Sequence, residues 1–345
     1  MANSNNEIVL QAVERALLSD VDFYCYRLPN SEVLEFGVDT SEKHTNKGFC
    51  VYPFSEDDAE PCFITNCLDA ECFLKTVVKE ISTYSSHNIQ LSTSKQDYLL
   101  HAERCIAELQ SGKLSKVVLS RTIAGRYDGK SWCDVFKTLL SAYPGAFVFI
   151  FKSLKAGAWL GATPERFLSY NKGVLSTMAL AGTRLAGTQG EWGNKELEEQ
   201  KIVADYIQRY LDLAKIQFEK SETYTRNAGN VEHICTDFEG INVSDKQIYY
   251  LRKNLHPTPA IAGTPTNKAI EYIRNTELHS RRYYGGYIGP MAENGDFDFF
   301  VNLRSLEFRG SDYCLYVGGG LTADSDKEKE WQETAEKART LQRFL

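Results

Sequence analysis

Two pairs of glutamates spaced three residues apart, Glu196/Glu199 and Glu330/Glu333, are placed to act together in this 345-residue chain. Both pairs lie in segments of helical periodicity, so each pair puts two carboxylates on one helix face. In each segment that face also carries the apolar stripe, so the carboxylates point toward the interior or a cleft. Interior carboxylates are unfavourable unless they are paired or bound to a cation. The alternatives are two exposed salt-bridging faces and a divalent-cation site shared by two helices, which the alignment favours.

Magnesium matches two carboxylate pairs better than zinc does, because it prefers oxygen ligands and retains several waters. The nine cysteines have no C-x-x-C spacing, and no second histidine stands at metal-ligand spacing from His256. We therefore expect Mg2+ as the cation, and reduced thiols in a cytoplasmic protein.

Lys116 and Glu165 could supply a base and an acid. Lys116 opens the segment KVVLSR, which reads as a strand. Such a lysine either snorkels at a sheet edge or is buried and acts as a base with a lowered pKa. Glu165 lies in GATPERF, at a bend after a proline. It is either an exposed acid paired with Arg166 or a general acid that burial keeps protonated.

An anion pocket is predicted near the end of the chain. The segment VGGGLTAD places the glycines 318–320 between a strand and a helix, where backbone amides can approach an anion. The spacing is not that of a nucleotide loop, so a carboxylate is the expected ligand, and a glycine turn without a ligand is the alternative. Arg304 can pair with such a carboxylate through two hydrogen bonds. Lys337 is either part of this pocket or only the helix partner of Glu333.

The elements that must position these residues follow from periodicity. Helices are predicted over 95–111, around 131–142, through Glu196 and Glu199, and at the C-terminus, with Asp324 or Ser325 as N-cap. Strands are predicted at 114–125, at 146–152, in GAWLGATPERFLSY and GVLSTMALAGTR, at 297–308 and at 312–323, with a polar linker around 219–230.

Many strands with helices in no regular βα alternation predict an α+β fold. We expect one large domain, residues 1–345, with mostly antiparallel β-sheets flanked by helices. Residues 1–93 carry no recognisable motif, and all the motifs lie in residues 94–345.

Composition limits the partners. With 46 acidic and 39 basic residues the net charge is −7 and there is no strong basic run, which argues against nucleic acid. No apolar run approaches the roughly 18 residues of a membrane helix, and the start lacks the regions of a secretory signal. A hard cation, an anion pocket and an acid–base pair would together suit a small polycarboxylate substrate.

The motifs KVVLSR, GATPERF, ALAGTR, ELEEQKIV, LHPTPAIAGTP, YYGGYIGP, NLRSLEF, VGGGLTADSD and EWQET, in this order, resemble those of the chorismate-utilising enzymes. That family includes isochorismate synthase, salicylate synthase, the large subunit of anthranilate synthase and aminodeoxychorismate synthase. The resemblance spans about residues 114–337. It implies a single large α+β domain with the active site in a deep cleft between sheets.

The resemblance also implies roles for the candidate residues. Lys116 would activate the water that attacks ring carbon 2 of chorismate, and Glu165 would protonate the hydroxyl that leaves carbon 4. Glu199 and Glu333 would be the principal Mg2+ ligands, with Glu196 and Glu330 nearby or acting through water. The substrate would be bound by Ala181, Gly182, Thr183, His256, Tyr284, Arg304, Gly318, Gly319, Gly320 and Lys337.

For His256 the resemblance and the residue type point in different directions. The resemblance places it near the leaving hydroxyl. A single histidine in a proline-flanked loop such as LHPTPAIAGTP is, however, more often a structural residue than a catalyst.

Two positions favour isochorismate synthase within the family. Anthranilate synthases usually have a neutral residue where this chain has Lys116, and aminodeoxychorismate synthases typically have a nucleophilic lysine where it has Ala181. Water, not ammonia, is therefore the expected nucleophile, and no glutaminase subunit is expected. The prediction is a magnesium-dependent isochorismate synthase, an isomerase of menaquinone or siderophore biosynthesis. The alternatives are a salicylate synthase, which goes on to eliminate pyruvate, and a non-catalytic homologue that binds a similar ligand.

Overall fold

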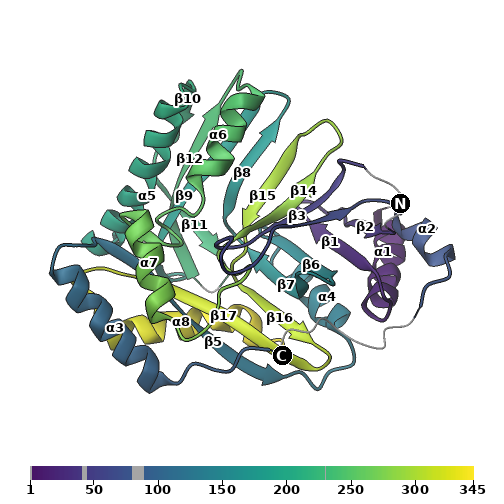
Figure 1. The fold of residues 1–345 in the computed structure, drawn as a ribbon, viewed down its shortest axis with the longest axis horizontal. Coiled ribbons are helices and arrows are strands. Elements are labelled where there is room, and N and C mark those ends of the chain that lie inside the picture. Colours follow the sequence, from purple (N-terminus) through teal and green to yellow (C-terminus); the bar gives the residue numbers. More distant parts are fainter. Residues whose placement is uncertain (1, 41–44, 80–88, 230) are drawn as a thin grey trace.

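Two antiparallel sheets form the centre of the molecule, and helices cover their outer faces (Figure 1). The computed structural model describes residues 2–40, 45–79, 89–229 and 231–345. Residues 41–44 and 80–88, which belong to the segment predicted to lack motifs, lie outside the described residues. The α+β class and the antiparallel sheets are as predicted.

In the described part of the chain the first sheet has eight strands. Their order is β13 (Gly263–Thr264), β5 (Lys116–Arg126), β17 (Asp312–Leu321), β16 (Ser305–Arg309), β7 (Gly157–Thr163), β6 (Phe147–Ser153), β1 (Asp22–Arg27) and β2 (Glu35–Asp39). Every residue of β6 and β7 is buried. That burial explains why AFVFIFK is a continuous apolar run and not an alternating pattern.

The described residues contribute nine strands to the second sheet. Their order is β10 (Phe218–Lys220), β12 (Val231–Gly240), β9 (Val174–Leu185), β8 (Arg166–Asn171), β15 (Phe297–Val301), β14 (Tyr287–Met291), β3 (Gly48–Tyr52) and β4 (Cys62–Thr65), with β11 (Tyr224–Ala228) also paired to β12. The polar linker predicted at 219–230 is therefore wrong, because β10 and β11 lie there. These short strands are largely exposed and carry no apolar alternation from which they could be read.

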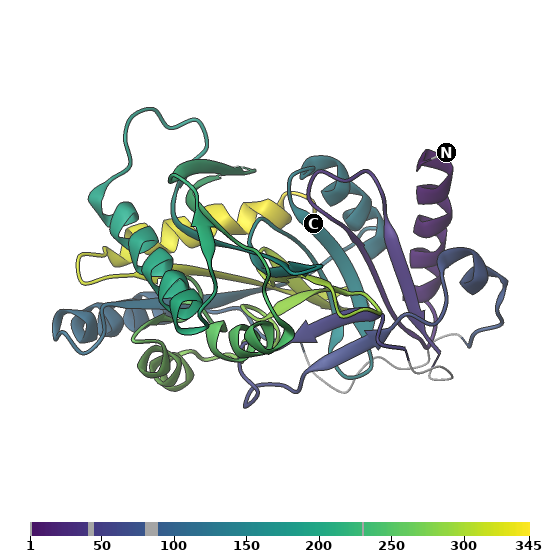
Figure 2. The ribbon, with the colours of Figure 1, turned by 90° about the horizontal axis from the view of Figure 1, so that it is seen from above.

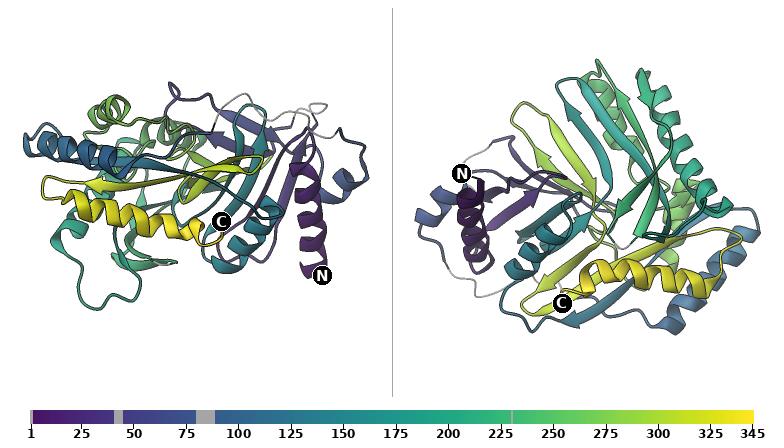
Figure 3. Two further views of the ribbon diagram at one scale, coloured as in Figure 1. Left: turned by 90° about the horizontal axis from the view of Figure 1, so that it is seen from below. Right: turned by 180° about the vertical axis from the view of Figure 1, so that it is seen from behind.

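The helices form the two outer layers. They are α1 (Ala2–Leu17), α2 (Ala70–Lys75), α3 (Lys95–Gln110), α4 (Trp132–Ala142), α5 (Asn194–Leu213), α6 (Asp245–Leu255), α7 (Thr266–Thr276) and α8 (Lys327–Gln342). α1, α4 and α8 lie against the first sheet, and α5 and α6 lie against the second (Figures 2 and 3). Their apolar residues are buried in the core on those faces. Among the described residues, no helix is long and apolar enough to cross a membrane.

A layer of aromatic side chains lies between the sheets and holds them together. Phe147 of the first sheet stacks on Phe300 of the second, with ring centroids 4.2 Å apart, a contact worth about 1 kcal/mol beyond its buried area. The N-terminal residues take part in both sheets, since β1 and β2 belong to the first and β3 and β4 to the second. The segment without motifs thus completes the framework that holds the motifs.

Candidate active site

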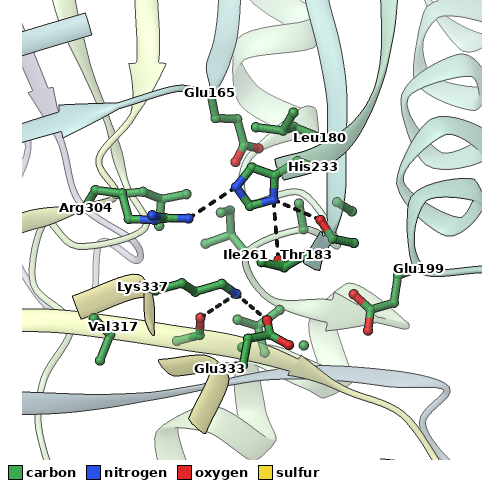
Figure 4. A pocket seen from close by; sticks show the side chains of 18 of the residues that line it. Glu165, Leu180, Thr183, Glu199, His233, Ile261, Arg304, Val317, Glu333 and Lys337 are labelled. Atoms are coloured by element: carbon green, nitrogen blue, oxygen red, sulfur yellow. Dashed lines mark hydrogen bonds and ion pairs between the residues drawn. The ribbon is translucent and has the colours of Figure 1, made fainter. Parts of the chain in front are cut away.

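A pocket is lined by residues of both sheets, of α5 and α8, and of the loops around Ile261 and Tyr284 (Figure 4). Its empty space is about 780 Å³, a figure that includes open solvent at its mouth. The predicted site residues that line it are Lys116, Glu165, Ala181, Gly182, Thr183, Glu199, Tyr284, Arg304, Gly318, Gly319, Gly320, Glu333 and Lys337.

Glu165 and Arg304 lie where the chain passes from one sheet to the other. The first passage joins β7 to β8 and the second joins β15 to β16. The Val301 amide donates to the Glu165 carbonyl across 3.0 Å, which ties the two passages together. Arg304 has a φ of 49°, a left-handed backbone conformation that is uncommon outside glycine. The segment 297–308, predicted as one strand, is therefore two strands in different sheets, and the break between them places Arg304 in the pocket.

Lys116 is buried at the start of β5, with 2% of its surface exposed. It does not snorkel at a sheet edge. β17 pairs with β5 so that Gly320 lies opposite Val118. A Cβ atom on Gly320 would approach the Lys116 Cε to 2.8 Å. Glycine at this position therefore gives the lysine side chain room to lie across the neighbouring strand.

The glycines 318–320 lie within the strand predicted at 312–323, and they do not form the turn that was the alternative. They extend β17, beyond Tyr316, where its pairing with β16 ends. One edge of this backbone segment is thus free of a neighbouring strand, and all three glycines line the pocket. The Gly318 carbonyl accepts a hydrogen bond from Lys337 across 3.1 Å.

Burial shifts the two candidate proton-transfer groups in opposite directions. Desolvation raises the pKa of Glu165 to about 8, although nearby cations oppose it: Lys116, Lys337, Arg226 and Arg304. Desolvation lowers the pKa of Lys116, against the charge of Glu199. Burial favours the neutral form of each group, which is a protonated acid and an unprotonated base.

A β-bulge turns His233, for which no role is predicted above, into the same pocket. The register between β9 and β12 shifts at His233, opposite Gly182 and Thr183. Gly182 has a φ of 71°, as a bulge glycine requires. The segment VEHICT could have signalled a strand, but a bulge is not visible in residue types.

His233 holds Arg304 in place (Figure 4). Its Nδ1 lies 2.9 Å from the Gly182 carbonyl, so this nitrogen carries the proton, and its Nε2 accepts from the Arg304 Nη2 across 3.2 Å. Burial and the Arg304 charge lower the pKa of His233 to about 3. The imidazole therefore stays neutral and acts as a hydrogen-bond acceptor for the guanidinium. Thr340 Oγ1 accepts from the Arg304 Nη1 across 2.8 Å.

Of the four glutamates whose alignment predicts an inward direction, Glu199 of α5 and Glu330 and Glu333 of α8 point inward, and Glu196 does not. Glu199 and Glu330 are buried, and Glu333 lines the pocket. Burial raises the pKa of Glu199. Although burial opposes it, the charge and hydrogen bond of Lys337, 2.6 Å away, lower the pKa of Glu333. Lys195 donates to Glu330 across 2.6 Å.

The N-cap prediction for α8 is wrong. Asp326, not Asp324 or Ser325, accepts from the Lys329 amide across 2.9 Å. The Ser325 hydroxyl instead donates to Glu330 across 2.7 Å. The Ser325 oxygen also accepts from the Thr322 amide across 3.0 Å, in the turn before α8.

Glu196, Glu330 and His256 do not line the pocket. Glu196 folds back toward Gly193 at the start of α5, where a Cβ atom would lie 2.5 Å from its Oε2.

The expectation for His256 is not met. Its Nε2 lies 3.0 Å from the Pro53 carbonyl, and its ring packs edge-on against Tyr52, Phe167 and Tyr287. The same motif contributes Ala260 and Ile261 to the pocket. His256 is thus the structural residue that its type alone suggested.

The chain belongs to the family of chorismate binding enzymes, whose model matches residues 18–343. It is 29% identical over 259 residues to the isochorismate synthase MenF of Bacillus subtilis (strain 168). The aligned region covers 72% of this chain and 55% of that protein. It is 27% identical over 290 residues to the anthranilate synthase component 1 of Aquifex aeolicus (strain VF5). That aligned region covers 79% of this chain and 57% of the relative. The chain thus spans a little more than half the length of these curated relatives.

Solved structures share the fold. The menaquinone-specific isochorismate synthase MenF of Escherichia coli has a TM-score of 0.80 at 21% identity, covering 98% of this chain and 91% of that chain. A structure described as a putative 2,3-dihydroxybenzoate-specific isochorismate synthase, DhbC from Bacillus anthracis, has a TM-score of 0.77 at 19% identity and covers 99% of both chains.

Proposed function

We propose that this chain is a magnesium-dependent isochorismate synthase, which converts chorismate to isochorismate. One observation carries the proposal: Lys116 and Glu165 are buried in the walls of one pocket, with pKa shifts that favour a neutral base and a neutral acid. Anthranilate synthases usually have a neutral residue at the position of Lys116. The lysine supports water as the nucleophile, so the reaction needs no ammonia and no glutaminase subunit.

Each protein group has one proton to move. Lys116 accepts a proton from the water that adds to ring carbon 2, and Glu165 donates a proton to the hydroxyl that leaves carbon 4. Each of the two ring double bonds moves by one position along the conjugated path that connects these carbons. One water is consumed and one is released, so the product is an isomer of the substrate.

Arg304 and Lys337 bind the substrate carboxylates in this proposal. Both line the pocket, and both are held by neighbours: Arg304 by His233 and Thr340, and Lys337 by Glu333. A fixed guanidinium can pair with a carboxylate through two hydrogen bonds. The backbone edge at the glycines 318–320 that β16 does not cover adds amide donors in this proposal.

The carboxylates fit a magnesium ion by their chemistry. Within the described ranges no group of three or more His, Cys, Asp or Glu side chains is assembled around one point. Magnesium, however, is usually held by one or two carboxylates together with waters and the substrate. Glu330 Oε2 is buried without a hydrogen-bond partner among the described residues, and a Cβ on Gly319 would lie 3.3 Å from it and 3.7 Å from Glu333 Oε1. We propose Glu199 and Glu333 as principal ligands. When bound, the ion supplies positive charge for the ring carboxylate.

The substitution Glu333→Gln should raise the magnesium concentration needed for half-maximal rate by about tenfold or more, because one anionic ligand is lost. Initial rates across a magnesium titration measure this effect. Glu336→Gln is the matched control, since Glu336 lies on the same helix and pairs with Arg339. A titration of Glu333→Gln that coincides with that of the unmodified chain would remove Glu333 from the ligand set.

The rate should depend on pH as a bell. It falls in alkali as Glu165 loses its proton, around its raised pKa of about 8, and falls in acid as Lys116 gains one. This expectation is tested by measuring the rate at saturating magnesium across the pH range in which the chain stays folded. A rate that stays level through the alkaline region would contradict the assignment of Glu165 as the acid.

The function itself is tested by incubating the purified chain with chorismate and magnesium, with and without EDTA, and identifying the products by chromatography. Isochorismate alone, lost with EDTA, is expected. Salicylate together with pyruvate would instead identify a salicylate synthase. No conversion under any condition would point to a non-catalytic homologue.

A further inference from the structure

Lys195 lies against the carboxylates that α5 and α8 bring together. Its Nζ is 2.6 Å from Glu330 Oε1 and 3.8 Å from Glu199 Oε1. The Lys195 side chain is 31% exposed, whereas those of Glu330 and Glu199 are 1% and 10% exposed. Its ammonium group therefore covers the solvent side of two buried carboxylates that belong to different helices.

Each carboxylate of this cluster has a lysine of its own. Lys116 lies 3.9 Å from Glu199, and Lys337 lies 2.6 Å from Glu333. Those two lysines also line the pocket, where one is the proposed base and the other a carboxylate ligand. Lys195 does not line the pocket, so it is not among the groups proposed to bind the substrate.

We propose that Lys195 is a built-in counter-cation that competes with the divalent cation for these carboxylates and thereby sets its affinity. The proposal rests on the proposed function, because it takes the cluster to be the magnesium site. The Lys195 ammonium and a divalent cation within a few ångströms of it repel each other. This repulsion is stronger in the partly desolvated surroundings than it would be in bulk water.

If only the Lys195 ammonium is removed, the buried Glu330 carboxylate loses its positively charged partner. Glu330 would keep the Ser325 hydroxyl as a donor at 2.7 Å but would lose its neutralising charge. A buried carboxylate without a counter-charge is strongly unfavourable. A divalent cation would then relieve this cost in addition to making its own contacts, so the same ion should bind more tightly.

The variant Lys195→Met keeps the apolar stem and removes the charge. We expect the full-length variant to bind Mn2+ at least tenfold more tightly than the unmodified chain, equivalent to about 1.4 kcal/mol. Free Mn2+ is measured by electron paramagnetic resonance without substrate, and Mg2+ is then added as the competitor. Lys201→Met, which removes an exposed lysine paired with Asp205 on the same helix, should leave the affinity unchanged.

Each outcome decides the proposal. Unchanged or weaker Mn2+ binding by Lys195→Met, when the unmodified chain binds saturably, would overturn the role of Lys195 and leave the metal site standing. Saturable binding by neither protein, both without chorismate and with it present, would overturn the metal site and this inference together. If Lys195→Met fails to fold, Lys195→Gln is measured in its place, and a larger Mn2+-induced rise in its melting temperature than in that of the unmodified chain is the supporting result.

Discussion

Replacing Lys116 with alanine is expected to lower the turnover of chorismate by about two to four orders of magnitude, the range that a positioned proton-transfer group contributes. Water is a weak nucleophile, and no other lysine of the pocket is placed to replace the base: Lys337 is occupied by Glu333 and the Gly318 carbonyl. Chorismate binding should be largely retained, because Arg304 and Lys337 remain.

Steady-state rates and a separate binding measurement distinguish lost chemistry from lost binding. Lys113→Ala is the control, since Lys113 precedes the same strand but is exposed and pairs with Glu108. Turnover by Lys116→Ala that matches this control would remove Lys116 from the mechanism.

Replacing Glu165 with glutamine is expected to have an effect of similar size, about two to four orders of magnitude on turnover. Glutamine has nearly the same shape and is neutral, like the protonated acid, so binding and folding should change little. It cannot donate a proton to the departing hydroxyl, which is a poor leaving group. The measurement is the rate at saturating chorismate and magnesium, with the melting temperature as a check on folding.

The control for Glu165 is Glu271→Gln, at an exposed position of α7. The alkaline fall in rate should also disappear from whatever activity Glu165→Gln retains. A residual rate that keeps the same alkaline fall would show that another group with a raised pKa is the acid.

The parts of the site that lie on helices could be predicted from the sequence. Glu199 falls on the same buried stripe as Val203 and Ile207, and Glu330 on the same stripe as Thr334 and Leu341. Helical periodicity is local, so the residues themselves show which face is buried. The direction in which these carboxylates point followed from that pattern alone.

The parts that depend on the passage of the chain between the sheets could not be predicted. Arg304 interrupts what reads as one apolar strand, and nothing in the residue types of FDFFVNLRSLEF marks a change of sheet. His233 enters the pocket through a bulge, which is set by the register of β9 against β12. Both features are long-range consequences of strand pairing, and single-strand patterns do not contain them.

For His256 the motif is in the expected place, but the side chain is not. The motif LHPTPAIAGTP does reach the pocket, through Ala260 and Ile261. Its histidine turns away because the Pro53 carbonyl and three aromatic rings surround it. The resemblance identified the correct loop, but the loop's side chain of most obvious chemistry is a packing residue.

The proposal that water adds to ring carbon 2 is tested most directly by tracing the oxygen atom of the new hydroxyl group. The chain is incubated with chorismate and magnesium in water labelled with oxygen-18, and the isochorismate is analysed by mass spectrometry. Water activated by Lys116 predicts that the product carries the label in its ring hydroxyl at carbon 2. Isochorismate without the label would mean that the original hydroxyl migrates within the substrate, and it would contradict the proposed base and acid together.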